Sequence, residues 1–201
     1  MNYTILVNRD NRLDKDFIPN NLVITDENEN NFHEYINPNL KPMIDEYVFK
    51  HFLIMRKAAK KEGFNIIIDS GYRSYEYQQD IWDKSLEEIG LEETKKVVAP
   101  AGASEHQTGF AFDVAYIING KYTDKVNEFQ EETKWLCNNS YKYGFILRYP
   151  KGKEDITGYS FEPWHYRFVG ILLAKELYEN DITLEEYYRK NEVKRHVKRI
   201  N

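Results

Sequence analysis

The chain has 201 residues, enough to bury a core, and a single domain over residues 1–201 is the simplest organisation. Hydrophobic residues make up 41% of it and aromatic residues 15%, which excludes an intrinsically disordered protein. The formal net charge is −5, so we expect neither nucleic acid nor an anionic membrane as a partner.

Cysteine usage and the N-terminal sequence bear on the cellular compartment. Cys137 is the single cysteine and cannot form an internal disulfide, which fits a reducing environment. Residues 1–20 lack the apolar segment of a signal peptide, and no stretch is long enough to span a bilayer. We therefore expect a cytoplasmic protein, although a chain trimmed of its signal or anchor would look the same.

The N-terminal segment, residues 1–40, is polar, and we expect it to be irregular and to pack on the core. An acidic and amide-rich run at 25–31 predicts a solvated loop within it. A helix is then predicted to open at Lys41-Pro42, since proline is tolerated in the first helical turn, and to end at Gly63, since glycine is favoured beyond the last turn.

The next two elements precede the first candidate site residues. Residues 64–69 are rich in β-branched side chains, which predicts a short buried strand. Ser74 is a suitable N-cap for a second helix over 75–89, which Gly90 is expected to end.

The strand predicted over residues 108–117 is the most informative element because its two faces differ. Side chains alternate between the faces of a strand. The odd-numbered positions carry small residues around a single carboxylate, Asp113, whereas the even-numbered ones are bulky: Phe110, Phe112, Val114 and Tyr116. A buried carboxylate is costly unless it is paired or bound to a metal. The face with Asp113 therefore has room for an ion and a substrate.

The remaining elements complete an alternation of helices and strands. We expect a helix over 126–143 stopped by Gly144, strands over 145–149 and 164–168, and helices over 171–178 and 184–189. Residues 190–201 are predicted to form a solvated basic tail.

Three residues form a candidate metal site: His106, Asp113 and His165. Two imidazoles and one carboxylate suit zinc, and three protein ligands leave the fourth position open, as in a catalytic site. Glu162 precedes His165 by three residues and could take a proton from water. Pro163 argues against a helix here, so this is not the helical His-Glu-x-x-His arrangement. The pattern predicts zinc-dependent hydrolysis.

These residues carry a family resemblance. The pattern Ser104-x-His106-x-x-Gly109-x-Ala111-x-Asp113, followed by Glu162-x-x-His165, resembles the D-alanyl-D-alanine metallopeptidases of the VanY type. The segments at 70–78 and 143–150 resemble further parts of that family, and the likeness spans about residues 64–170. Residues 1–8 resemble the soluble VanXY branch, whose members combine D,D-dipeptidase and D,D-carboxypeptidase activity and support glycopeptide resistance.

The resemblance implies a fold and a set of roles. The expected fold is of the α+β class: a small antiparallel sheet that carries one zinc per chain and is flanked by helices. It makes His106, Asp113 and His165 the zinc ligands, Glu162 the general base, and Arg73 the group that faces the scissile carbonyl. Substrate contacts are expected from five further residues, with most of the tryptophan ring in the core: Ser104, Gln78, Ser70, Tyr72 and Trp164.

The implied substrate is a peptidoglycan precursor peptide or the dipeptide D-Ala-D-Ala. Two alternatives remain open: an endolysin-like peptidase that cuts elsewhere in the peptide stem, and a non-catalytic zinc-holding interaction module. The resemblance also places Ser70 near the substrate pocket. Serine is uncharged there, whereas an acidic residue would repel an acidic stem peptide, so this position favours carboxypeptidase activity. The preference between dipeptide and pentapeptide and the oligomeric state stay open.

Overall fold

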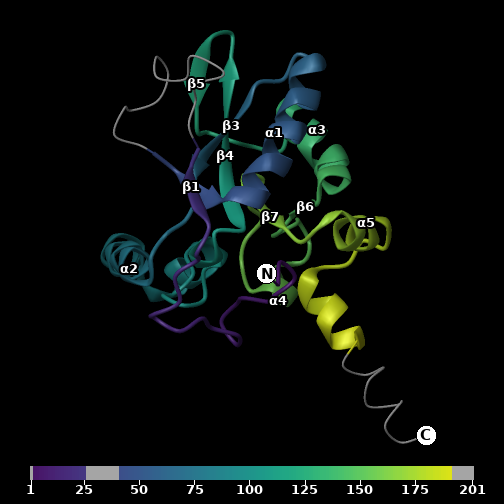
Figure 1. The fold of residues 1–201 in the computed structure, drawn as a ribbon. Helices are drawn as coiled ribbons and strands as arrows, with labels where there is room; N and C mark the ends of the chain where they lie inside the picture. The colour runs from purple at the N-terminus through teal and green to yellow at the C-terminus, as the bar shows by residue number, and fades with distance from the viewer. Residues whose placement is uncertain (1, 26–40, 192–201) are drawn as a thin grey trace, which may run out of the picture.

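The computed structural model describes residues 2–25 and 41–191, and the predicted acidic loop and basic tail lie largely outside these ranges. Figure 1 shows the α+β fold that the sequence predicts. In chain order the elements are β1 (Leu22–Ile24), β2 (Met43–Asp45), α1 (Glu46–Lys61), β3 (Ile66–Ser70), α2 (Tyr75–Val97), η2 (Glu105–Thr108), β4 (Ala111–Ile118), β5 (Lys121–Thr123), α3 (Glu131–Asn139), η3 (Ser140–Tyr143), β6 (Phe145–Leu147), α4 (Glu154–Thr157), β7 (His165–Phe168) and α5 (Ile171–Glu179). Residues 184–191 are also helical.

The central sheet is antiparallel, with strand order β3-β4-β7-β6 and with β5 paired to β4. Helices α1 and α3 lie on the same face of this sheet (Figure 1). The even-numbered side chains of the predicted strand enter the main core there, as expected, together with residues of both helices: Phe110, Phe112, Val114, Tyr116, Phe52, Met55, Trp135 and Leu136. The opposite face of β4 carries Asp113, and farther along the strand Ala115 packs there against Ile67.

The first helix begins later than predicted. Met43–Asp45 form strand β2, which pairs with β1, so the N-terminal segment is not wholly irregular. Asp45 caps α1, because its Oδ1 accepts hydrogen bonds from the backbone N–H groups of Tyr47 (3.0 Å) and Val48 (3.2 Å). An aspartate cap satisfies the free N–H groups of the first turn, whereas Pro42 would satisfy none of them.

Loss of this cap gives the first testable prediction. Asp45→Ala removes the acceptor from two backbone N–H groups, so the free energy of unfolding should fall by about 0.5–2 kcal/mol. In a chain of this size Tm then drops by roughly 2–4 °C for each kcal/mol. Asp45→Asn keeps the acceptor oxygen and is the matched control for thermal unfolding. Equal losses in both variants would mean that the charge of Asp45, and not the cap, stabilises α1.

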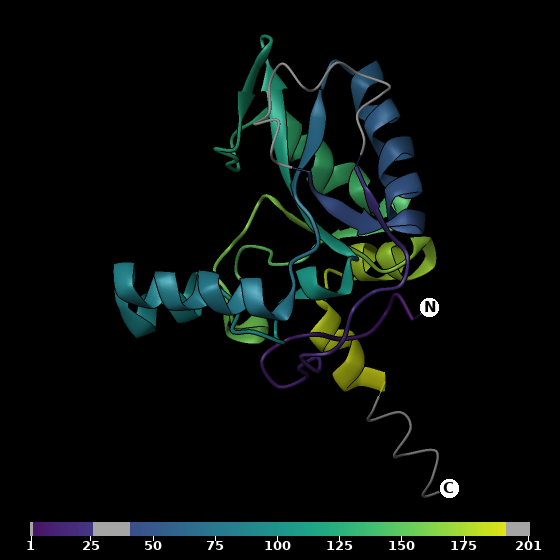
Figure 2. The same ribbon diagram turned by 60° about the vertical axis from the view of Figure 1, so that its left-hand side comes forward.

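Two helices differ in extent from the prediction. Gly90 has φ 77° and interrupts α2 where a helix end was expected, but helical backbone resumes and continues to Val97. Figure 2 shows α2 extending to one side, away from the central sheet. Helix α3 begins at Glu131 and passes into the turn η3 before Gly144. Within the described ranges, no helix combines the length and the apolar character that a bilayer crossing requires.

Candidate metal centre and its cavity

The strand register sets three side chains in a row across the sheet. Asp113 of β4 lies opposite His165 of β7 and opposite Ser70 of β3. Residues directly opposite one another in antiparallel strands project to the same face. The register of β3 shifts between Ile68 and Ser70, which makes Asp69 the extra residue of a β-bulge. The bulge places the hydroxyl of Ser70, and not the carboxylate of Asp69, next to Asp113.

His106 comes from the turn η2, and its ring lies beside Asp113 and His165. Gly109 ends this turn with φ 71°, a left-handed conformation that favours glycine, and its N–H bonds the carbonyl oxygen of His106. The ring of His106 is held from behind, because its Nδ1 lies 2.6 Å from the carbonyl oxygen of Gly71. Gly71 approaches β2 so closely that a Cβ there would lie 2.1 Å from the oxygen of Met43. Glycine at 71 therefore lets this loop support His106.

The three predicted ligands converge, with one donor atom from each lying within 4.8 Å of the others. Nε2 of His106 is 3.4 Å and Nδ1 of His165 is 3.0 Å from Oδ1 of Asp113. Since a carbonyl can only accept, Nδ1 of His106 donates to Gly71, and the lone pair of Nε2 points toward the cluster. Two nitrogens and one carboxylate oxygen are donors that suit zinc. The residues present thus fit a metal.

The ionisation of these groups reflects their burial and their closeness. Burial, and then the charge of Arg73, lower the pKa of His106 to about 4. Burial acts against ionisation of His165 and Asp113 as well. For His165 it is outweighed by hydrogen bonds with Asp113 and Glu105, and for Asp113 by the interactions with His106, His165 and Arg73. The pKa of His165 therefore rises to about 9, and that of Asp113 lies well below its usual value.

Glu162 lies beside the cluster without joining it. Its Oε2 is 4.0 Å from Nδ1 of His165, and burial raises its pKa to about 7. The backbone fixes this position, because the N–H of Glu162 donates to the carbonyl of Tyr149 and the N–H of His165 donates to the carbonyl of Glu162. The carboxylate is thus held close to a ligand but outside bonding distance, as a general base requires.

Arg73 has one side of its guanidinium anchored and the other directed at the cluster. Nε donates to Oγ of Ser70 (3.2 Å) and Nη1 to Oε1 of Gln78 (3.0 Å). Nη2 lies 2.8 Å from Oδ2 of Asp113 and 2.7 Å from Nε2 of His106. The guanidinium, itself a cation, therefore meets two of the donor atoms that a metal would use.

A cavity of about 210 Å³ opens on these groups. Of the predicted substrate contacts, Ser104, Gln78 and Trp164 line it. Gln78 is buried, and it uses Oε1 for Arg73 and Nε2 for the carbonyl of Ala99 (2.8 Å), so it positions the guanidinium. Sequence reasoning did not identify several further lining residues: Ile81, Val97, Val98, Tyr149 and Tyr159.

Ser70 and Tyr72 are not among the described lining residues of this cavity. The hydroxyl of Ser70 accepts from Nε of Arg73, which turns it toward the guanidinium. The residues on either side of Tyr72 bond His106, through Gly71 O and Arg73 N, whereas the N–H of Tyr72 donates to Met43. The backbone of Tyr72 is thus bonded to β2, and Ser70 is linked to the cavity through Arg73.

Behind the cluster lies a buried ion-pair network that the sequence did not predict. Oε1 of Glu105 accepts from Nε of Arg148 and from Nη1 of Arg167, each at 2.8 Å. Glu185 binds the same Arg148 through two hydrogen bonds of 2.9 and 2.6 Å. Burial opposes ionisation of Glu105, but the two guanidinium groups outweigh it, and its pKa lies below the usual range. Adjacency to His106 was the only signal in the sequence for Glu105, and nothing in it paired residues so far apart.

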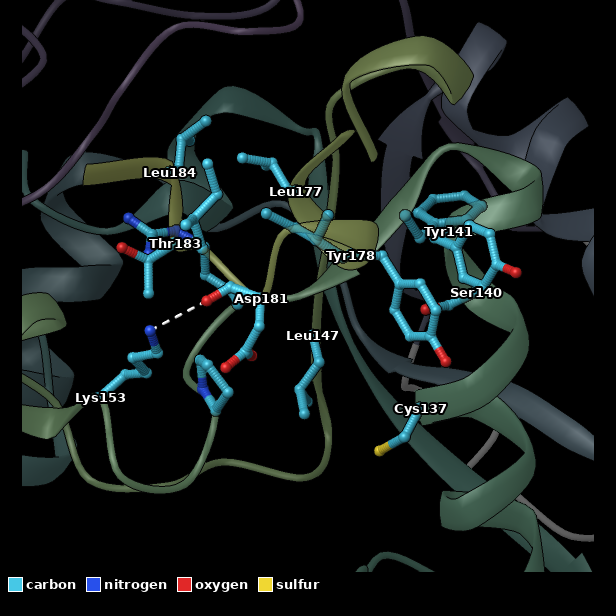
Figure 3. Close-up of a pocket in the computed structure, with 15 residues that line it drawn as sticks. Cys137, Ser140, Tyr141, Leu147, Lys153, Leu177, Tyr178, Asp181, Thr183 and Leu184 are labelled. Atoms are coloured by element: carbon cyan, nitrogen blue, oxygen red, sulfur yellow. Dashed lines mark hydrogen bonds between the residues drawn. The ribbon is translucent and has the colours of Figure 1, made fainter. Parts of the chain in front are cut away.

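A second cavity, of about 200 Å³, lies between β6, η3 and α5 (Figure 3). Leucine and tyrosine side chains make up much of its wall in Figure 3, and Nζ of Lys153 donates to the carbonyl of Asp181 (2.9 Å). No cluster of possible metal ligands among the described residues lies there. Of these two cavities, the first is the one that is lined by the candidate metal ligands.

Known proteins resemble this chain over most of its length. The family described as VanY: D-alanyl-D-alanine carboxypeptidase matches residues 41–171. YodJ of Bacillus subtilis (strain 168) is 44% identical over 189 residues, which are 94% of this chain and 68% of that protein. The bifunctional D-Ala-D-Ala dipeptidase and carboxypeptidase VanXYC of Enterococcus gallinarum is 32% identical over 201 residues, 94% of each chain.

Solved structures agree with these sequence matches. The LdcB LD-carboxypeptidase is 44% identical with a TM-score of 0.79, covering 92% of this chain and 85% of its own. A mutant of the D,D-pentapeptidase VanY in complex with Zn(II) is 34% identical with a TM-score of 0.76, covering 94% and 99%. VanYB in complex with D-alanine-D-alanine is 34% identical with a TM-score of 0.74, covering 93% and 97%. These matches confirm the resemblance and the fold class that the sequence predicts.

Proposed function

This chain belongs to the VanY family of D-alanyl-D-alanine carboxypeptidases, and from that premise we propose that it is a zinc-dependent peptidase that removes C-terminal D-alanine from peptidoglycan peptides. His106, Asp113 and His165 hold the zinc in this proposal, and the zinc complex of a related VanY supports the choice of metal. When bound, zinc supplies a Lewis acid that activates water and polarises a carbonyl.

The observation that carries the proposal is the meeting of three kinds of group in one cavity: a candidate metal site, a carboxylate outside it and an anchored guanidinium. Glu162 takes the proton from the attacking water and later passes it to the leaving amine. Arg73 stabilises the negative charge that develops on the carbonyl oxygen. A zinc-holding interaction module needs neither group, so their position argues against that alternative.

The metal and the substrate are tested together. We expect one zinc per chain by elemental analysis of protein prepared without chelators. The zinc-loaded protein should release D-alanine from D-Ala-D-Ala or from a stem pentapeptide that ends in D-Ala-D-Ala. Chelation should abolish the release, and added zinc should restore it. Zinc-loaded protein that releases no D-alanine from any stem peptide would contradict the proposal.

L,D-carboxypeptidase activity is a second candidate, and the similarity to LdcB favours it. A tetrapeptide stem that ends in an L-residue followed by D-alanine distinguishes it from the D,D activity. Release from the pentapeptide but not the tetrapeptide identifies the D,D-carboxypeptidase, and the reverse identifies the L,D enzyme. Cleavage inside the stem, detected by mass spectrometry, would identify the endopeptidase. Only the D,D activity removes the D-Ala-D-Ala terminus and so supports vancomycin-type resistance.

A further inference from the structure

Glu105 lies behind His165, on the side of the ring away from Asp113. Oε2 of Glu105 is 3.5 Å from Nε2 of His165, whereas Nδ1 of the same ring lies 3.0 Å from Asp113. Both Oε2 and Nε2 are buried, and neither has another hydrogen-bond partner among the described residues. A buried polar atom left without a partner costs about 1–3 kcal/mol. Each of these two atoms is therefore the partner available to the other.

The carboxylate of Glu105 is fixed from its opposite side. Oε1 accepts from Arg148 and from Arg167, and these three side chains are 0% exposed. Arg148 in turn donates two hydrogen bonds to Glu185, which lies in the last described helix. Arg167 donates its remaining hydrogen bonds to backbone carbonyl groups, two of them in the N-terminal segment. Because Oε1 is held by two cations, Oε2 is left facing His165.

We propose that Glu105 is a positioning residue of the metal centre, which accepts the Nε2–H of His165 and thereby keeps Nδ1 for the metal. A ligating histidine whose second nitrogen donates to a carboxylate has its tautomer and ring orientation fixed and its basicity raised. The inference rests on the proposed zinc site. It extends the site to the network formed by Glu105, Arg148, Arg167 and Glu185. Through this network the N-terminal segment and the last described helix both support His165.

Glu105→Gln tests this role because the network dictates how the amide must lie. Arg148 and Arg167 both donate to the Oε1 position, so the amide oxygen has to take it. The NH₂ group then faces Nε2 of His165 and donates where the carboxylate accepted. That reverses the favoured tautomer and puts the proton on Nδ1, the nitrogen that faces Asp113. We expect zinc affinity to fall by about 10–100-fold.

Glu185→Gln is the matched control. It removes one buried negative charge from the same network and also faces Arg148, but it leaves Glu105 and His165 in place. Zinc affinity is measured by competition with a fluorescent zinc chelator, and thermal unfolding of the metal-free variants checks that each is folded. We expect both variants to lose stability but only Glu105→Gln to lose most of its affinity. Equal losses of zinc affinity in both variants would mean that Glu105 stabilises the fold and does not specifically position His165.

A spectrum of the unmodified protein keeps the test decisive should Glu105→Gln not fold. With zinc bound, nitrogen-15 NMR of the histidine rings should show a protonated Nε2 and a zinc-bound Nδ1 for His165. Zinc on Nε2 would overturn the proposal. Because these measurements use zinc alone and no substrate, they test the role of Glu105 separately from the proposed peptidase activity. An inactive protein with this spectrum retains the role of Glu105, whereas an active protein whose zinc affinity is unchanged in Glu105→Gln loses it.

Discussion

Glu162→Gln should leave zinc bound and remove most of the hydrolysis. The carboxylate lies 4.0 Å from Nδ1 of His165, outside the set of three ligands, so its loss should not empty the site. Glutamine keeps the size of the side chain but cannot accept a proton from water. A general base contributes typically about 10²–10⁴-fold, and we expect kcat to fall within that range.

Zinc content and D-alanine release are measured on the same preparation. Glu131→Gln is the control, because Glu131 is an exposed glutamate on α3 that pairs with Lys134 (2.7 Å). Turnover close to the unmodified enzyme with zinc present would mean that another group is the base. Loss of zinc would instead make Glu162 a ligand or a support of one.

The face pattern of one strand predicted much of this centre. The alternation around Asp113 separated the core face of β4 from its open face, and the structure follows it, with Phe112 and Tyr116 fully buried in the core. This prediction succeeded because alternation depends only on the local backbone. The later start of α1 was missed for a similar local reason, since the capping role of Asp45 competes with the proline signal at 42.

Long-range contacts could not be predicted in the same way. Arg148 lies in the segment 143–150, which resembles part of the VanY family. Its pairing with Glu105 and Glu185, however, spans 43 and 37 residues and has no periodic signature. The β-bulge at Asp69 decides whether a carboxylate or a hydroxyl lies beside Asp113, and one residue of register changes that outcome. Gln78 illustrates the consequence, because its hydrogen bond to Arg73 was not predicted, whereas its place in the cavity wall was.

The anchoring of Arg73 leads to the second large effect. Two of its nitrogens are held by Ser70 and Gln78, and the third points at Asp113 and His106. A guanidinium fixed in this way needs no reorganisation when negative charge develops on the substrate oxygen. Arg73→Ala should then lower kcat and kcat/KM together, by about 10²–10³-fold, with KM changed less.

Steady-state kinetics of zinc-loaded Arg73→Ala and Arg73→Lys separate the possible roles of this side chain. Lysine should restore little, because a single ammonium cannot bond Ser70 and Gln78 and also reach the cavity as the planar guanidinium does. Arg73 is the one guanidinium among the described lining residues, so it could instead grip the terminal carboxylate of the substrate. In that case KM rises while kcat holds, since the contact is equally strong before and during the reaction. Zinc content is measured for each variant, because Arg73 also touches two of the proposed ligands. A fall in kcat with zinc retained and KM nearly constant assigns Arg73 to the transition state.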